Sequence, residues 1–217
     1  VAEGLASAGI NGEKARSVWL HARAWETGEP QVRKPPTFPE SVPIHFYDIE
    51  TFEECTYLHG VVRVCGDVRE EKQFLARSPS QERDAWHAFL DYLARDTTAL
   101  VYCWARHEFR FVERLEETYG GNPDGLRHLH GMRDQCAFVK EHFALPVSGY
   151  GIKVVAPLFG FHWNAEDAGG LNSESWYRDW LDTGDETIIQ KIMRYNLDDV
   201  LAMEAIDRAL RTFCGRP

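Results

Sequence analysis

The apolar residues of this chain follow two patterns, and each predicts one kind of regular structure. Apolar residues spaced three and four apart predict helices, whereas short runs rich in β-branched and aromatic residues predict strands. The expected strands span 44–50, 57–66, 72–76 and 99–103, with a short one near 129–134. The expected helices span 12–27, 81–95, 106–119, 135–142, 152–158, 173–181 and 185–213. A turn is expected at 120–125 and a loop at 146–150.

The order of these elements predicts the fold class. Three early strands are followed by helices that alternate with strands, and then by helices alone. This order is typical of an α/β protein with a mixed sheet, here of about five strands, flanked by helices on both faces.

A proline-rich stretch divides the chain. Residues 28–40 contain four prolines, which is typical of an extended linker. We therefore expect residues 1–41 to be a helical stub and a linker that continue from a preceding region. Residues 42–217 are expected to form the compact domain.

Acidic residues interrupt the apolar face of the first strand. Side chains alternate between the two faces of a strand, so Ile44, Phe46, Asp48 and Glu50 share one face. The two carboxylates lie roughly 6.6 Å apart along the strand and repel each other unless a cation lies between them. An ordinary polar strand end is the alternative interpretation of this pair.

The last helix places an acid where a core residue is expected. Asp199 lies within an apolar stripe of Ile188, Ile192, Tyr195, Met203, Ile206, Leu210 and Phe213. Tyr195 lies one turn before it. Glu108 similarly leads the stripe of Val112, Leu115 and Tyr119. Three elements thus each direct an acid inward, and such oxygen ligands suit Mg²⁺ or Mn²⁺.

Composition narrows the function classes. The net charge of −10 argues against a protein that coats nucleic acid nonspecifically, but not against a nuclease whose carboxylates hold metal ions. The five cysteines are widely spaced, which predicts reduced thiols in a cytoplasmic protein. No apolar run approaches the ~18 residues of a membrane helix. The locally basic stretches 106–114 and 127–133 are either phosphate contacts or solvated surface.

Three motifs, in this order, resemble those of the DEDDy 3′–5′ exonucleases. They are YDIET at 47–51, LVYCWARHEF at 100–109 and YNLDD at 195–199. More narrowly, the chain resembles the ribonuclease-H-like, YprB-like domain of predicted RecB-family nucleases. The proline linker, YGIKVVAPLFGFHW at 150–163 and the YNLDDV ending support this resemblance, which covers about residue 11 to the C-terminus.

The resemblance implies a role for each matched position. Asp48, Glu50, Glu108 and Asp199 would hold two ions of Mg²⁺ or Mn²⁺, and Tyr195 would orient the attacking water. The sequence departs from the family at the second motif, where Glu108 replaces the usual aspartate and Trp104 replaces a common asparagine.

Other residues are candidates for binding the substrate. Thr51 and Phe52 follow the first acidic pair and are placed to touch a terminal nucleotide. Trp104 is a candidate for stacking on a base and Lys153 for contacting phosphate, although a core tryptophan and a surface lysine are the default alternatives. Trp163, Trp176 and Trp180 are further stacking candidates, and of these four tryptophans we expect at most one to stack on a base.

Two further acids each have two interpretations, and the alternative for Asp134 is a position near the candidate site. Asp134 is interpreted as the cap of the helix that follows it, and Asp198 as either solvated or a neighbour of the metal ligands.

The sequence therefore favours a metal-dependent 3′–5′ exonuclease that hydrolyses single-stranded DNA or RNA. The resemblance places it in DNA repair, within a longer polypeptide that carries other nuclease or helicase domains. One alternative is an inactive ribonuclease-H-like module that binds nucleic acid within a larger nuclease or helicase. A second is a scaffold domain whose acids bind a structural cation.

Overall fold

The computed structural model describes residues 12–164 and 172–215. Five of the strands form one mixed sheet with the order β4-β3-β2-β5-β6, as expected from the sequence. β2 pairs antiparallel with β3 and parallel with β5, which in turn pairs parallel with β6. The strands are β2 Ile44–Phe52, β3 Cys55–Cys65, β4 Val68–Leu75, β5 Leu100–Cys103 and β6 Arg133–Asp134.

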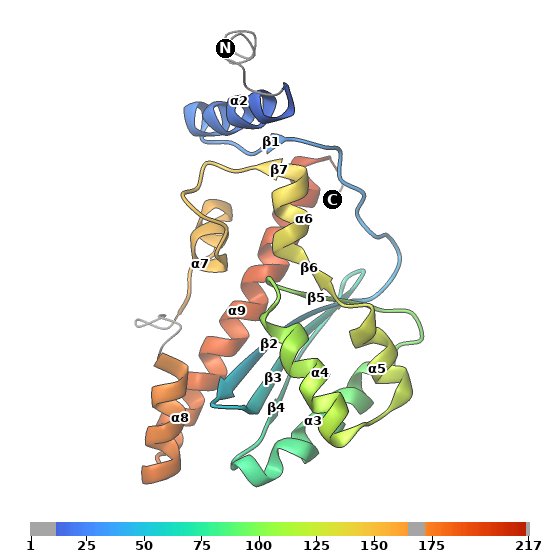
Figure 1. Cartoon of the computed structure of the whole chain (residues 1–217), viewed down its shortest axis with the longest axis vertical. Coiled ribbons are helices and arrows are strands. Elements are labelled where there is room, and N and C mark those ends of the chain that lie inside the picture. The colour runs from blue at the N-terminus through green and yellow to red at the C-terminus, as the bar shows by residue number, and fades with distance from the viewer. Residues whose placement is uncertain (1–11, 165–171, 216–217) are drawn as a thin grey trace.

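Helices cover both faces of this sheet, as predicted (Figure 1). Tyr47 and Ile49 of β2 pack against α3, α4 and α5 on one face. Ile44 and Phe46 point the other way, toward α6 and α9. The helices are α3 Glu82–Leu93, α4 His107–Tyr119, α5 Pro123–His130, α6 Gln135–His142 and α9 Glu186–Phe213. The alternation along β2 therefore builds two cores, one on each side.

The carboxyl end of β2 is enclosed by α8 and α9. A third core joins Tyr57 and Leu58 of β3 to Tyr177 of α8 and Ile192 of α9. A register irregularity follows Glu50 in the pairing of β2 with β3, and such bulges redirect the side chains that follow them. The elements that precede α9 in the described chain are α7 Ile152–Val155, the 3₁₀ turn Ala156–Phe159 and α8 Asn172–Thr183.

The N-terminal elements pack on the far end of the molecule (Figure 1). β1 Gln31–Val32 pairs antiparallel with β7 Phe143–Ala144, and α2 Gly12–Thr27 lies beside both. The division of the chain at residues 41 and 42 stays a prediction. A 3₁₀ turn, Pro79–Gln81, precedes α3. No helix within 12–164 or 172–215 is long and apolar enough to cross a membrane.

One helix was missed by the sequence interpretation. Residues 120–125 were expected to be a turn and 129–134 a strand, but α5 occupies 123–130 and β6 is only two residues long. Asn122 caps α5 by accepting a hydrogen bond from Asp124 N, and Pro123 occupies its first turn. The pair Asn122-Pro123 therefore begins a helix instead of forming a turn. A Cβ on Gly125 would lie 2.4 Å from Leu90 O, so glycine lets α5 approach α3 closely.

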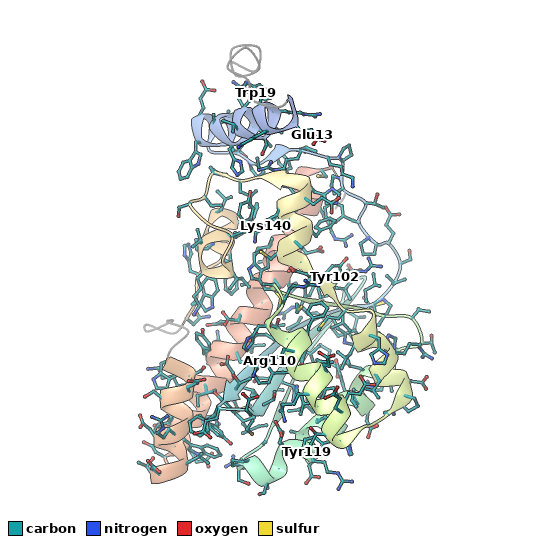
Figure 2. The ribbon with its side chains drawn as sticks, in the orientation of Figure 1. Glu13, Trp19, Tyr102, Arg110, Tyr119 and Lys140 are labelled. Carbon is teal, nitrogen blue, oxygen red and sulfur yellow. The ribbon has the colours of Figure 1, made fainter. Side chains whose placement is uncertain are left out.

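Smaller differences concern the ends of elements. β4 begins at Val68 instead of 72, because residues 68–71 continue the ladder with β3 as an edge strand of mostly charged residues. On α9, Ile189 is buried where the stripe placed Ile188, and Phe213 is exposed at the end of the helix. Tyr102 of β5, labelled in Figure 2, stacks on Phe46 in the core between the sheet and α6, and this contact joins the two central strands.

Candidate metal centre and active site

Three carboxylates converge at the carboxyl end of β2. Asp48 and Glu50 come from β2 and Asp199 from α9, and one oxygen of each lies within 4.8 Å of the others. Glu50 and Asp199 are buried, and Asp48 is partly exposed. The alternation of β2 directs both of its acids toward α9, and the helix period places Asp199 on the face that packs against the sheet. The predicted gathering of these three acids is thus observed.

Burial and mutual repulsion both disfavour ionisation of these acids. Burial, followed by the charge of Asp199, raises the pKa of Glu50 to about 8. Burial, then the neighbouring acids, raises the pKa of Asp48 well above its ordinary value. The Lys153 ammonium partly offsets the repulsion, since its charge opposes the increase at both Glu50 and Asp199. A divalent cation would relieve the remaining repulsion, and an all-oxygen donor set suits Mg²⁺ or Mn²⁺. The residues present therefore fit a metal ion.

Glu108 lies beside this group without belonging to it. It occupies the first turn of α4 and is buried, as its place in the stripe predicted. Among the described residues, its Oε2 has no hydrogen-bond partner. Its charge contributes to the raised pKa of Asp48, so the two carboxyl groups are neighbours. A buried carboxylate oxygen without a donor is costly, and a cation is the kind of partner that would satisfy it.

Tyr195 and Lys153 meet at the wall of the site. Lys153 donates a hydrogen bond to the Tyr195 hydroxyl, and its ammonium lies 4.3 Å from the centre of the tyrosine ring. Tyr195 is buried one turn before Asp199 on α9. The lysine therefore contacts the tyrosine in this structure and helps to fix its hydroxyl.

The segment after α7 contributes a donor that sequence reasoning did not assign. The sequence analysis considered Trp163 only as a residue that stacks on a base, but its Nε1–H donates to Asp199 Oδ1 at 2.6 Å. Asn164 donates to both oxygens of Asp198, from its backbone N and its side-chain Nδ2. Asp198 is fully buried, so its interpretation as a solvated acid is wrong. It ties Asn164, the residue after Trp163, to α9.

A polar cavity of ≈ 240 Å³ opens at the three carboxylates. Thr51 and Tyr195 line it, as do three residues that the sequence analysis did not single out, namely His107, Ser173 and Glu174. Ser173 and Glu174 begin α8, and no spacing in the sequence links that helix to β2. Only the packing of α8 against the strand brings them together.

The other substrate-binding candidates lie outside this cavity. Phe52 packs against Tyr177, with the Arg178 guanidinium 5.4 Å from its ring centre. Trp104 is 9% exposed, and its Nε1–H is donated to Tyr150 O at 3.0 Å. Its ring belongs to the core between the sheet and α9, which leaves little surface for a base.

Asp134 acts as expected. Its carboxylate accepts a hydrogen bond from Ala137 N at 2.8 Å and caps α6. The prediction that it caps this helix is confirmed.

Asn196, which the motif analysis passed over, is directly attached to the site. It is fully buried, and its Nδ2 donates to Asp48 Oδ2 at 2.9 Å. The signal that would have found it is Gly60, a glycine inside a buried strand, which marks a close approach of another group. A Cβ on Gly60 would lie 1.9 Å from Asn196 Oδ1.

A protein-family model matches most of the chain. The family model described as the RNase_H superfamily matches residues 45–211. This span starts within β2 and ends within α9, so it contains all the acids described above. No curated protein and no solved structure matches the chain.

Proposed function

Since the chain belongs to the RNase_H superfamily, we propose that it is a 3′–5′ exonuclease of the DEDDy kind, acting on single-stranded DNA or RNA. An RNase H-like domain indicates a nuclease-type function on nucleic acid, and the acidic cluster is compatible with it. The motif order and the tyrosine one turn before Asp199 support the narrower assignment. The YprB-like resemblance supports a position among other nuclease or helicase domains.

In this proposal the acids of the site hold two Mg²⁺ or Mn²⁺ ions. Asp48, Glu50 and Asp199 supply the oxygens that lie together, and Glu108 supplies the oxygen that lacks a donor among the described residues. Bound ions of this kind activate water and stabilise the leaving oxygen of an in-line displacement.

The chain's own residues orient the reactants. Tyr195, held by Lys153, lines the cavity and presents its hydroxyl to the attacking water. The water oxygen bonds to phosphorus as the P–O3′ bond breaks. The water releases one proton and the leaving O3′ gains one, which yields a 5′-mononucleotide and a shortened chain with a 3′ hydroxyl. Thr51 and His107, on the cavity wall, are placed to contact the terminal nucleotide.

One observation carries the proposal. β2 and α9 bring three carboxylates within 4.8 Å of one another around a polar cavity. Among the described residues, the positive charge that opposes them is that of Lys153. Trp163 and Asn196 donate hydrogen bonds to these acids, but a purely structural cluster would also be matched by positive charge. Perturbed acids in a cavity are typical of functional sites.

The test is cleavage of labelled single strands. The substrates are single strands of DNA or RNA that carry a label at either the 3′ or the 5′ end. Wild-type protein should shorten them stepwise from the 3′ end in Mn²⁺ or Mg²⁺, and not in EDTA. Asp199→Asn should lower the rate by more than about 100-fold, since even outer contacts to metal ligands are worth about 10–100-fold. The matched control is Asp207→Asn on the same helix, where the acid pairs with Arg211 at 2.6 Å, and it should remain active.

The place of Glu108 outside the three-acid group favours one second candidate, an inactive nucleic-acid-binding module. If the site is catalytic, Glu108→Gln should abolish cleavage while strand binding persists, because uncleaved substrate is held mainly by phosphate and base contacts. If the domain only binds, wild type and Glu108→Gln should be equally inert in Mn²⁺ and should shift labelled strands equally in a gel. A scaffold with a structural cation should bind neither DNA nor RNA.

The remaining expectations stay proposals. The proline-rich stretch 28–40 supports a domain that spans residues 42–217. The free cysteines of the described chain support a reducing, cytoplasmic setting. A role in DNA repair follows from the family resemblance alone.

A further inference from the structure

The amide of Asn196 has a buried position between the sheet and the acids. This residue follows Tyr195 on α9 and is 0% exposed. Its Nδ2 donates to Asp48 Oδ2 at 2.9 Å, and it also hydrogen-bonds Glu50. The asparagine thus touches two acids of the candidate metal centre, from the same helix that supplies Asp199.

A second amide determines which way Asn196 faces. Gln73 of β4 donates from Nε2 to Met193 O at 2.7 Å and to Asn196 Oδ1 at 3.0 Å. A backbone carbonyl only accepts hydrogen bonds, so Met193 O requires the nitrogen of Gln73 to point toward α9. Because the Gln73 nitrogen is a donor, the atom of Asn196 that faces it must be the amide oxygen. The Asn196 nitrogen is left facing Asp48, as a donor.

The backbone of β3 provides the space for this amide. Gly60 pairs with Asp48 across β2 and β3. A Cβ at Gly60 would lie 1.9 Å from Asn196 Oδ1 and 2.8 Å from its Cγ, closer than any real contact. Since no side chain larger than hydrogen fits there, the asparagine lies against the strand directly beside the acid.

We infer that Asn196 is a positioning residue, which Gln73 orients and Gly60 accommodates, and which holds the Asp48 carboxylate in place to bind a divalent cation. The inference rests on the proposed metal centre. Asn196 occupies Asp48 Oδ2 with a single directed donor and so restricts rotation of the carboxylate. Hydrogen bonds of this kind to ligating groups orient them for the metal.

The first test measures Mn²⁺ affinity directly, by following the signal of free Mn²⁺ in electron paramagnetic resonance titrations. Asn196→Ala should weaken Mn²⁺ binding by about 10- to 100-fold, the usual effect of removing a hydrogen bond to a metal ligand. The melting temperature of the metal-free variant shows whether it folds. If the folded variant binds Mn²⁺ as tightly as wild type, the inference is overturned.

Gln73→Glu tests the relay without changing Asn196. The new carboxylate adds negative charge near the site, which by electrostatics alone would tighten cation binding. It cannot donate to Asn196, however, so the amide loses the contact that directs its nitrogen at Asp48. The inference therefore predicts that Gln73→Glu binds Mn²⁺ more weakly than wild type, which is the opposite of the purely electrostatic expectation. Binding equal to or tighter than that of wild type would overturn it.

A double variant and a matched control complete the experiment. In an Asn196→Ala background, Gln73→Glu should no longer weaken Mn²⁺ binding, because coupled residues are not additive; an undiminished effect would contradict the relay. The control is Gln135→Glu, since Gln135 Nε2 also donates to an α9 carbonyl, Met203 O at 3.0 Å. It should leave Mn²⁺ affinity near that of wild type. Wild type that binds no Mn²⁺ would overturn the metal centre itself, together with this inference.

Discussion

Glu82 and Glu50 are both buried glutamates, 4% and 5% exposed, but their surroundings differ. Glu82 accepts hydrogen bonds from Thr56 N, from the Arg114 guanidinium and from the Tyr119 hydroxyl, which projects from the end of α4 (Figure 2). Its charge is matched by one arginine. Glu50 instead shares a cavity with Asp48 and Asp199.

The difference separates a structural acid from a functional one. Burial of a carboxylate is costly in both places, but at Glu82 the fold itself compensates the cost with donors and a positive charge. At Glu50 the described residues supply hydrogen bonds from Ser173 and Asn196 and the charge of Lys153, but two further acids share the cavity. A site of that kind is stable only with a further cation or with bound protons. Burial alone therefore does not identify a functional acid, whereas burial among other acids, with only partial compensation of their charge, does.

The largest expected effect is on the stability of the metal-free protein. Glu82→Gln should lower the free energy of unfolding by about 3 kcal/mol, because it leaves Arg114 without its charged partner. For a chain of this size that corresponds to roughly 6–12 °C in melting temperature. Glu50→Gln should keep or raise the melting temperature, since it removes repulsion. Thermal melts in EDTA measure both, and a larger loss for Glu50→Gln than for Glu82→Gln would reverse the comparison.

The next effect is the response to metal. Mn²⁺ at about 100 times its dissociation constant should stabilise wild type by about 2.7 kcal/mol, through preferential binding to the folded state. Mn²⁺ should stabilise Glu82→Gln by the same amount as wild type, although this variant is less stable without metal, because Glu82 lies outside the cavity. Asp48→Asn should gain far less. Melting with and without Mn²⁺ measures this, and equal shifts in wild type and Asp48→Asn would rule out Asp48 as a ligand.

The smallest effect is the pH dependence without metal. The pKa of Glu50 is raised by burial from an ordinary 4.5 to about 8, so between these values the folded state binds more protons than the unfolded state. Its contribution to stability is therefore present at low pH and is lost as pH rises toward 8. The stability advantage of Glu50→Gln over wild type should grow across this window in EDTA. An advantage that does not change with pH would contradict the shift.

Asp96 provides a control of opposite sign for the pH experiment. Its hydrogen bond from Arg63 lowers its pKa to about 2 from an ordinary 3.8. The stability it contributes is present above pH 3.8 and is lost as pH falls toward 2. Asp96→Asn should therefore reduce the loss of stability as pH falls from 3.8 toward 2, which thermal melts over this range measure.

Part of the fold and site followed from the sequence because it depends on local periodicity. The period of two along β2 set Phe46 and Asp48 on one face and Tyr47 on the other, as the structure has them. The helical period did the same for Asp199 on α9. α5 was missed although its signal was local, because Asn122-Pro123 is common both in turns and at helix starts.

Other features depended on which elements pack together, and no spacing along the chain contains that information. The sequence by itself determined the α/β class and the inward direction of Asp48, Glu50, Glu108 and Asp199. Only the tertiary structure decided that Gly60 lies opposite Asp48, that Asn196 fills the space above that glycine, and that Trp163 donates to Asp199. Each of these contacts joins residues distant in sequence, so it exists only once strand order, register and helix packing are fixed. Periodicity sets the face on which a side chain lies, and the assembled fold sets which side chain it meets.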